Sequence, residues 1–516
     1  MKRRPTALLT TAVYVAACIV GLSLLSGVYT QSSAAPVPSS DTLRFALTHD
    51  PQSLDPMIDS SGVTQNILHN IFDSLVMADD DLRQTGDLAT SWKFVPPSSW
   101  DFTLRPNVRF HNGDPVTAGD VKFSFDRIID PASRSPMKGF ISAITSVAIV
   151  DARTVRITTA HPSAILPELT KNVMIVPQRV VESMGAQAFG RAPVGSGPYR
   201  FVEWVPNDHM TLQANASYWN QAPPIRTLIL RPIPEPSTRV AALLTGQVDM
   251  ITGFPPSFVS ALQANPNIKV VNEPASRTAQ IILNTNPSDG FAPFQDRRVR
   301  QAMNYAIDYD ALIRQIMGGL ARRNCNPVPP IFFGYDPSIQ CYAYNPDRAK
   351  QLLAEAGYSN GFEVEFGATS GSVPNDREVA EAIVGMLARV GVRARLETPE
   401  FGVWIANYRA RKWPMVFHTN GDVVLDADQV FGLFYFSGGR RYYSSPDMDR
   451  LVIASRNEFD PAKRLPLVRT VIRRAVRDAL WISLFNMPGL WAMNSRLNFK
   501  PRGDEWTVMS RATWSR

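Results

Sequence analysis

The chain has 516 residues, of which 45% are hydrophobic and 19% are charged, and its formal net charge is +7. This length exceeds what one hydrophobic core organises, so we expect two or three domains of an ordinary globular protein. The basic residues are scattered among acidic ones without a dense lysine–arginine block, which argues against a nucleic-acid-binding protein.

The first 35 residues have a composition of their own. Three basic residues at positions 2–4 precede an uncharged stretch over 6–30, and a small polar segment follows at 31–35. This order is typical of a secretory signal, so we expect residues 1–35 to be a signal peptide that is cleaved off. Two alternatives stay open. The uncharged stretch is long enough to remain as a membrane anchor, and residues 15–18 (VAAC) resemble a lipoprotein cleavage box.

Three cysteines occur, and Cys18 would leave with the signal. Cys325 and Cys341 then remain as an even pair, which in an oxidising compartment predicts a disulfide across a loop. Two lone cysteines without neighbouring histidines do not indicate a metal site. No further uncharged apolar run is long enough to span a bilayer, so the sequence does not predict a protein with several membrane spans.

Short strands and hairpins dominate the first half of the expected structure. In chain order we predict a strand at 43–47, a hairpin at 102–110 that turns at Pro106–Asn107, a helix capped by Thr117, a hairpin at 199–214, a helix between Ser237 and Gly246, and a strand at 248–251. The hairpins follow from alternation of apolar and polar residues around turn-forming Pro and Asn.

Helices become more regular after about residue 280, with predicted helices over 299–306, from Asp308 to Gly318, and from Asn345 to Gly357. The next segment alternates at 362–366, has helical periodicity at 380–387 and alternates again at 392–396. This predicts a β-α-β unit with parallel strands. Ligands of such sheets sit beyond the carboxyl ends of the strands. Two polar segments are expected there: the loop 369–375 and the segment 419–422, which follows a predicted strand at 415–418.

Four sequence motifs make the chain similar to a known family. They are FTLRPNVRFHNGDPVTAGDV at 102–121, PVGSGPY at 193–199, LTGQVD at 244–249 and DRRVRQA at 296–302. With them the chain resembles the extracellular solute-binding protein family 5, which comprises the periplasmic oligopeptide-, dipeptide-, glutathione- and nickel-binding components of ABC importers. The resemblance runs from about Leu43 to the last few residues. The motifs belong to the scaffold and say little about the ligand.

The resemblance implies an α/β, two-lobed periplasmic-binding-protein fold (type II, cluster C-like) with an extra subdomain in the N-terminal lobe. By this analogy the chain crosses between lobes near Ile281–Asn284 and returns near Ser483–Asn486. The implied divisions are lobe I at 41–76, 200–280 and 487–516, the extra subdomain at 77–199, and lobe II at 281–486. Closure of two lobes about a hinge is the implied mechanism.

Peptide binders of this family hold the ligand's ammonium with an aspartate in a loop that follows a strand of the second lobe. The matching region here is 420–428 (NGDVVLDAD). By this resemblance Asp422 is the first candidate anchor and Asp426 the second, because a desolvated ammonium needs an opposite charge. A solvated loop aspartate or a helix cap is the alternative for both residues.

The loop 370–375 is a second candidate region, in which Ser370, Ser372 and Asn375 are the candidate residues and the loop would donate hydroxyl and backbone hydrogen bonds. Many relatives have an arginine just after the glycine of this loop, where Ser372 stands here. The resemblance therefore implies that one carboxylate anchor is missing. Arg409 and Arg411 are candidate substitutes, although exposed surface arginines are commoner.

Each of the two aromatic residues near the candidate loop has either a ligand-binding or a structural role. Trp404 packs either on a ligand side chain or within the scaffold. His418 precedes the candidate loop and would suit a metal chelate, since nickel binders belong to the family. Six histidines without ligand-spaced clusters favour a structural histidine instead. His111 lies inside a scaffold motif, so we expect a structural role for it.

The function implied by the resemblance is the substrate-binding component of an ABC importer. Such a component captures a peptide or peptide-like solute and delivers it to permease and ATPase subunits. We expect a monomer in the periplasm that needs no cofactor, no metal and no nucleic acid. We do not expect an enzyme, because the Gly-x-Ser-x-Gly and His-Glu-x-x-His motifs and a phosphate-binding glycine loop are missing.

Three alternatives remain. The same role with a non-peptide ligand is one, namely an opine, a sugar, glutathione or a metal chelate. A secreted hydrolase that uses carboxylates such as Asp422 and Asp426 is the second. The third is an interaction protein or chaperone that presents a loaded lobe to a receptor.

Overall fold

The computed structural model describes residues 41–421, 424–437, 439 and 442–515. The predicted signal peptide, residues 1–35, and the candidate anchor Asp422 lie outside the described residues. Within the described ranges, none of the helices has the length and apolar character that crossing a membrane would require.

The largest sheet of the described chain combines strands from both halves of the sequence. Its main order is β15 (Val392–Glu397), β14 (Phe362–Gly367), β16 (Met415–Asn420), β12 (Ile268–Leu283), β17 (Trp481–Asn494), β11 (Met250–Thr252), β1 (Thr42–Leu47), β10 (Thr227–Pro232), β9 (His209–Ala214) and β8 (Tyr199–Val205). A short strand, β13 (Arg322–Arg323), adds to β17.

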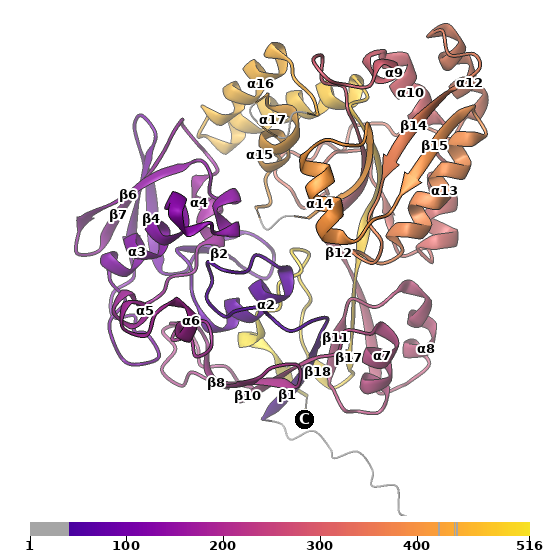
Figure 1. Ribbon diagram of the computed structural model, residues 1–516. Helices are drawn as coiled ribbons and strands as arrows, with labels where there is room; N and C mark the ends of the chain where they lie inside the picture. Colours follow the sequence, from indigo (N-terminus) through magenta and orange to yellow (C-terminus); the bar gives the residue numbers. More distant parts are fainter. Residues whose placement is uncertain (1–40, 422–423, 438, 440–441, 516) are drawn as a thin grey trace, which may run out of the picture. The chain divides into compact units, whose positions relative to one another are not determined.

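Strands β12 and β17 are the longest in the sheet and pair antiparallel along most of their length. Their register is irregular between Pro274 and Thr278. Before this point β12 packs on one apolar core through Ile268, and after it Ala275 and Ile281 belong to another. The two strands therefore connect two separately packed groups of elements (Figure 1).

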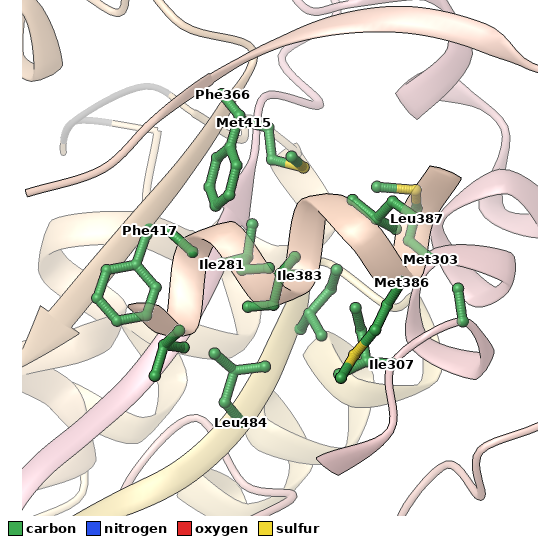
Figure 2. Close-up of a cluster of buried hydrophobic side chains, with 14 of the residues drawn as sticks. Ile281, Met303, Ile307, Phe366, Ile383, Met386, Leu387, Met415, Phe417 and Leu484 are labelled. Carbon is green, nitrogen blue, oxygen red and sulfur yellow. The ribbon is translucent and has the colours of Figure 1, made fainter. Parts of the chain in front are cut away.

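The β-α-β unit predicted from the sequence is confirmed. Strands β14 and β15 pair parallel, with helix α13 (Asp376–Ala388) between them in the chain, and β14 also pairs parallel with β16. Figure 2 shows Ile383 of α13 beside Ile281 of β12, in the same buried cluster as Phe366 of β14 and Phe417 of β16. This packing places the ends of β14 and β16 at one edge, where the candidate loops begin.

The other face of these strands packs against the C-terminal helices α14 (Phe401–Arg409), α15 (Ala427–Val430), α16 (Pro446–Arg456) and α17 (Pro461–Arg477). Trp413 is fully buried in this second layer, and its ring fills the space where Gly367 of β14 lacks a side chain. Apolar residues therefore cover both faces of the β14–β16 region, as expected for parallel strands.

A separate four-stranded sheet lies within residues 89–159, in the order β4 (Ala89–Val95), β5 (Ser99–Leu104), β7 (Thr154–Thr159) and β6 (Ile144–Asp151). The helix predicted after Thr117 is confirmed as α3 (Ala118–Ile129), with a capping box between Thr117 and Asp120. The hairpin predicted at 102–110 is wrong. Strand β5 pairs with β4 and β7, whereas Val108 and Phe110 bond to residues 114–116 of their own loop.

The hairpin predicted at 199–214 is confirmed as β8 and β9, which turn through Asn207 at φ 63°. The glycine motif before it packs against α2 (Gly62–Ile71): a Cβ on Gly195 would lie 2.0 Å from the Ile71 carbonyl oxygen. His111 secures the same segment, because its Nδ1 accepts from Gly195 N–H and its Nε2 lies 2.9 Å from the Gly197 carbonyl oxygen. His111 therefore has the structural position that its motif predicted.

The remaining predicted helices are confirmed with small shifts of their ends: α7 (Pro236–Leu244), α10 (Arg297–Tyr305) and α12 (Pro346–Glu355). The helix expected from Asp308 is a short α11 (Tyr309–Ala311) followed by a π-helical turn at Leu312–Ile316. Asp308 and Asn345 cap their helices with their side chains, as the sequence suggested.

Candidate functional site

A cavity of about 340 Å³ lies beside the middle of the two long strands. Arg277 of β12 and the segment Met487–Trp491 of β17 form part of its wall. The loop after β14 contributes Ser372–Pro374, and the N- and C-terminal parts of the chain contribute Asn66 and Glu505. This space, called the cleft cavity below, has a volume at the lower end of the range of about 300–1,000 Å³ typical of small-molecule pockets.

One buried carboxylate organises the loop 369–375 that enters the cleft cavity. Asp376 accepts hydrogen bonds from the backbone N–H groups of Gly371 at 2.8 Å and Ser372 at 2.9 Å, and from the Thr369 hydroxyl at 2.7 Å. These backbone donors are thus directed at Asp376. What the loop presents to the cavity is the exposed Ser372 and the neighbouring Val373 and Pro374.

We predict that Asp376→Asn accelerates backbone amide exchange in this loop about tenfold, because an amide replaces a charged acceptor that serves several N–H groups. Hydrogen exchange followed by mass spectrometry of peptides covering 369–375 measures the effect. Glu378→Gln, at an exposed position of α13, is the matched control and should leave exchange unchanged. Equal exchange in the Asp376→Asn variant and the wild type would show that the carboxylate does not hold the loop.

The cleft cavity carries one arginine and one glutamate among its described lining residues. Arg277 Nη2 lies 3.4 Å from Glu505 Oε2, and the two side chains are 35% and 37% exposed. The Arg277 guanidinium also passes against Gly421, where an added Cβ would lie 3.2 Å from Arg277 Cζ. Arg277 is therefore positioned where β12, the end of β16 and the C-terminal segment meet.

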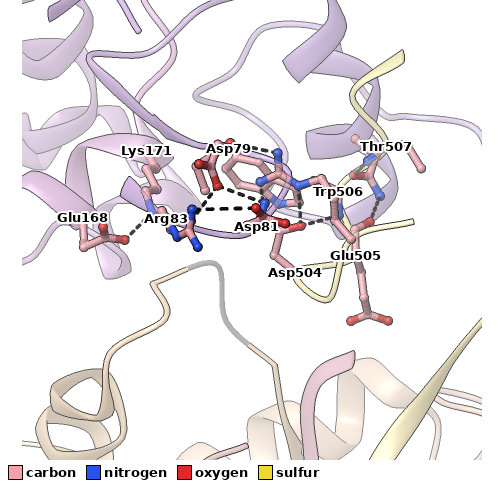
Figure 3. A network of polar contacts seen from close by, with 12 residues as sticks. Asp79, Asp81, Arg83, Glu168, Lys171, Asp504, Glu505, Trp506 and Thr507 are labelled. Atoms are coloured by element: carbon pink, nitrogen blue, oxygen red, sulfur yellow. Dashed lines mark hydrogen bonds and ion pairs between the residues drawn. The ribbon is translucent and has the colours of Figure 1, made fainter. Parts of the chain in front are cut away.

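The segment that carries Glu505 is held by polar contacts on both sides (Figure 3). Asp504 binds Arg502 through two hydrogen bonds of 2.5 and 3.0 Å. Asn66 of α2 donates to the Glu505 carbonyl oxygen and accepts from Thr507 N–H. These contacts fix the backbone and leave the Glu505 side chain directed away from them.

A histidine lies beneath the same segment. The ring of His69 on α2 is buried and lies against Trp506, with ring centroids 3.5 Å apart. Burial, and then the charge of Arg502, lower the pKa of His69 to about 3. His69 is therefore neutral in the folded protein at ordinary pH.

Asp426 lies in a different place from the cleft cavity. Both of its carboxylate oxygens bind the Arg464 guanidinium, at 2.5 and 2.9 Å, and one also accepts Asp428 N–H to cap α15. Both partners of this ion pair are more than 90% buried. Asp426 faces another cavity, of about 290 Å³, together with Glu168, whose pKa is raised by burial. The carboxylate of Asp426, the second candidate anchor, is thus paired with Arg464.

Trp404 and His418 belong to an aromatic cluster of the second layer. Trp404 of α14 is buried and stacks on Phe401 and Tyr408, with ring centroids 6.0 and 5.1 Å apart. His418 of β16 lies against Tyr408 and the edge of Phe434. Neither Trp404 nor His418 lines the cleft cavity. The described residues contain no group of three or more His, Cys, Asp and Glu side chains placed to hold a metal ion.

The other described residues predicted for the site also lie outside the cleft cavity, except Ser372. Ser370 is exposed outside the lining of the cleft cavity, and Asn375 adopts a left-handed conformation at φ 60° that begins α13. Arg411 pairs with Asp289, and Arg409 is exposed at the end of α14, so neither reaches the cavity. Of the predicted loop residues, Ser372 is the one placed in the cavity wall.

Arg277 and Glu505 were not identified from the sequence. Arg277 is a single basic residue inside a strand, and Glu505 stands 228 positions later in an irregular segment. They meet because the C-terminal segment runs beside β12, where Ser276 N–H donates to the Gly503 carbonyl oxygen at 2.5 Å. The predicted cysteine pair, in contrast, is joined in the structure: Cys325 and Cys341 form a disulfide with their Cα atoms 5.2 Å apart.

Comparison with known proteins places this geometry in a family. The model described as bacterial extracellular solute-binding proteins, family 5 Middle, matches residues 83–442. Heme-binding protein A of Haemophilus influenzae is 31% identical over 443 residues, covering 80% of this chain and 79% of that protein. The glutathione-binding protein GsiB of Pectobacterium atrosepticum is 27% identical, over 89% of this chain and 91% of its own length.

Solved structures agree with these sequence likenesses. The ABC transporter-associated periplasmic binding protein DppA from Helicobacter pylori, in complex with the peptide STSA, matches with a TM-score of 0.79 and 28% identity, over 92% of this chain and 98% of that chain. HbpA2 from Haemophilus parasuis matches with a TM-score of 0.81 and 25% identity, over 92% and 100%. The chain therefore has the fold of the periplasmic binding proteins and belongs to family 5 of the bacterial extracellular solute-binding proteins.

Proposed function

We propose that this protein is the substrate-binding component of an ABC importer and that it captures a peptide or peptide-like solute in the cleft cavity. The observation that carries the proposal is the position of that cavity. Its wall combines residues of the long strands β12 and β17, the loop after β14 and the C-terminal segment. Movement of the lobes about β12 and β17 would therefore open or close it. The loaded protein then delivers the solute to permease and ATPase subunits.

The choice of a peptide-like solute is supported by relatives that span nearly the whole chain. DppA from Helicobacter pylori is in complex with the peptide STSA, and several relatives are glutathione-binding proteins. A non-peptide ligand is the second candidate, because MoaA from A. tumefaciens R10, 27% identical with a TM-score of 0.76, is in complex with mannopinic acid. Both choices keep the same site and the same role.

The proposed role also fixes where the protein acts and that it binds its solute without transforming it. We place the mature protein in the periplasm as a monomer, with residues 1–35 as its export signal. Binding rather than catalysis agrees with the state of Asp426, the described carboxylate of the hydrolase alternative. Its two oxygens are held by Arg464 in a buried ion pair, and it does not line the cleft cavity.

Titration calorimetry with Ser-Thr-Ser-Ala and with glutathione, followed by mass analysis of the recovered solute, tests the proposal. We expect one site per chain for at least one of the two probes and recovery of the solute unchanged after release. Hydrolysed or otherwise altered probe would favour an enzyme instead. Absence of binding for both peptides, together with saturable binding of mannopinic acid, would favour the second candidate.

A further inference from the structure

The charges that line the cleft cavity are few and opposite. Among its described lining residues, Arg277 is the single arginine or lysine and Glu505 the single aspartate or glutamate. The remaining wall is made of glycines, apolar residues, Ser and Thr hydroxyls and the Asn66 amide, with His49 as the other titratable side chain. Any charged group of a solute in this cavity therefore meets Arg277 or Glu505 first.

The contact between these two residues is loose. It consists of one pair of atoms at 3.4 Å between side chains that are each about one-third exposed. The Asp426–Arg464 pair is different, with two bonds of 2.5 and 2.9 Å between buried groups. A single, partly hydrated contact contributes little to stability, so a competing anion can replace it at small cost.

Arg277 is nevertheless well placed to accept such an anion. Its backbone lies in the irregular stretch of β12 between Pro274 and Thr278, directly before Thr278, whose hydroxyl bonds to Asn486 of β17. Its guanidinium packs against the Gly421 backbone, where a larger residue would crowd it. A guanidinium fork binds a carboxylate through two parallel N–H donors, which one oxygen of Glu505 does not satisfy.

We propose that Arg277 is the carboxylate-binding residue of the cleft cavity and that a ligand carboxylate displaces Glu505 from it. The inference rests on the proposed function and narrows its ligand to solutes that carry a free carboxylate. Many relatives have an arginine where Ser372 stands in the β14 loop, and Ser372 carries no charge to bind a carboxylate. We assign that role to Arg277 of β12 instead. Glu505 then acts as an internal competitor that occupies the arginine until the ligand arrives.

The test uses Ser-Thr-Ser-Ala and glutathione as free acids and as their carboxamides, measured by titration calorimetry. Three variants are compared with the wild type: Arg277→Ala, Arg277→Lys and Glu505→Gln. Arg393→Ala is the matched control, because it removes an arginine of β15 from an exposed pair with Glu363 of β14, outside the cleft cavity. Circular dichroism confirms that each variant is folded.

For the wild type we expect an acid to bind roughly tenfold more tightly than its amide, the size of effect typical of a charge-assisted hydrogen bond. Arg277→Ala should abolish this acid-to-amide ratio, and Arg277→Lys should reduce it because an ammonium lacks the fork. Glu505→Gln should bind the acids at least as tightly as the wild type, since the competing carboxylate is gone. Arg393→Ala should keep the wild-type ratio.

Several results would overturn the inference. One is an amide that binds the wild type as tightly as its acid, and another is an unchanged ratio in Arg277→Ala. If Arg277→Ala does not fold, an unchanged ratio in Arg277→Lys together with weaker binding of acids to Glu505→Gln counts against it equally. Tight binding of amides by the wild type would leave the proposed function standing, whereas wild-type protein that binds neither the acids, nor the amides, nor mannopinic acid would contradict both.

Discussion

Replacing Arg464 with alanine should lower the free energy of unfolding by about 3–5 kcal/mol, because it leaves the buried Asp426 carboxylate without a partner. Both side chains are more than 90% buried, and Arg464 holds both oxygens of Asp426. Urea unfolding followed by fluorescence measures the loss. Arg450→Ala, which removes an exposed pair with Asp447, is the control and should cost less than about 1 kcal/mol.

A double variant of the same ion pair tests whether Asp426 has a structural role or a ligand-binding role. We expect the double variant Asp426→Leu/Arg464→Met to recover much of the stability that Arg464→Ala loses, since an apolar pair of similar volume often replaces a buried ion pair without cost. It should also bind the wild-type ligand with unchanged affinity. A folded double variant that has lost binding would mean that Asp426 anchors the ligand after all.

The stability of the protein should fall on acidification because of His69. The pKa of His69 is lowered to about 3 in the folded state, mainly by burial and then by Arg502, from an ordinary value of 6.5. Below pH 6.5 the unfolded chain takes up a proton that the folded chain excludes, so this stabilisation is present above pH 6.5 and is lost as the pH falls toward 3. The loss amounts to about 2 kcal/mol at pH 5 and about 3 kcal/mol at pH 4, relative to pH 7.

His69→Phe provides the measurement, because phenylalanine retains an aromatic ring against Trp506 and does not titrate. The difference in unfolding free energy between pH 7 and pH 5 should be about 2 kcal/mol smaller in His69→Phe than in the wild type. The matched control is His209→Gln on β9, where neighbouring Asp208 and Glu203 raise the pKa of a partly exposed histidine. It should not flatten the profile. Parallel profiles for His69→Phe and the wild type would place the acid sensitivity elsewhere.

Local elements of the fold followed from the sequence where one segment contains its own signals. Thr117 with Asp120, and Asn345 with Pro346, mark helix starts that the structure confirms. The β-α-β unit at 362–397 was predictable for the same reason, since alternation and helical periodicity follow each other within a short stretch. The hairpin at 102–110 failed because alternation identifies a strand but not its partner. Strand β5 takes its partners from β4 and β7.

The candidate site was harder to predict from the sequence than the local elements, because its charged residues are paired with partners far away in the chain. No sequence feature near Asp426 indicates that it pairs with Arg464, which lies 38 positions later. Arg277 and Glu505 are equally inconspicuous in the sequence, and they meet because the C-terminal segment runs beside β12. Ser372 was found because the carboxyl ends of parallel strands are a general location of binding loops. Asp422 lies outside the described residues and stays a prediction.

Native mass spectrometry of protein extracted from the periplasm without refolding tests the central claim most directly. We expect a fraction of the protein to carry one additional small molecule, and the same mass to be recovered unaltered when the protein is gently unfolded. That mass should fit a solute with a free carboxylate. A bound molecule whose mass changes during incubation with fresh protein would contradict the view that this protein captures a solute and surrenders it intact.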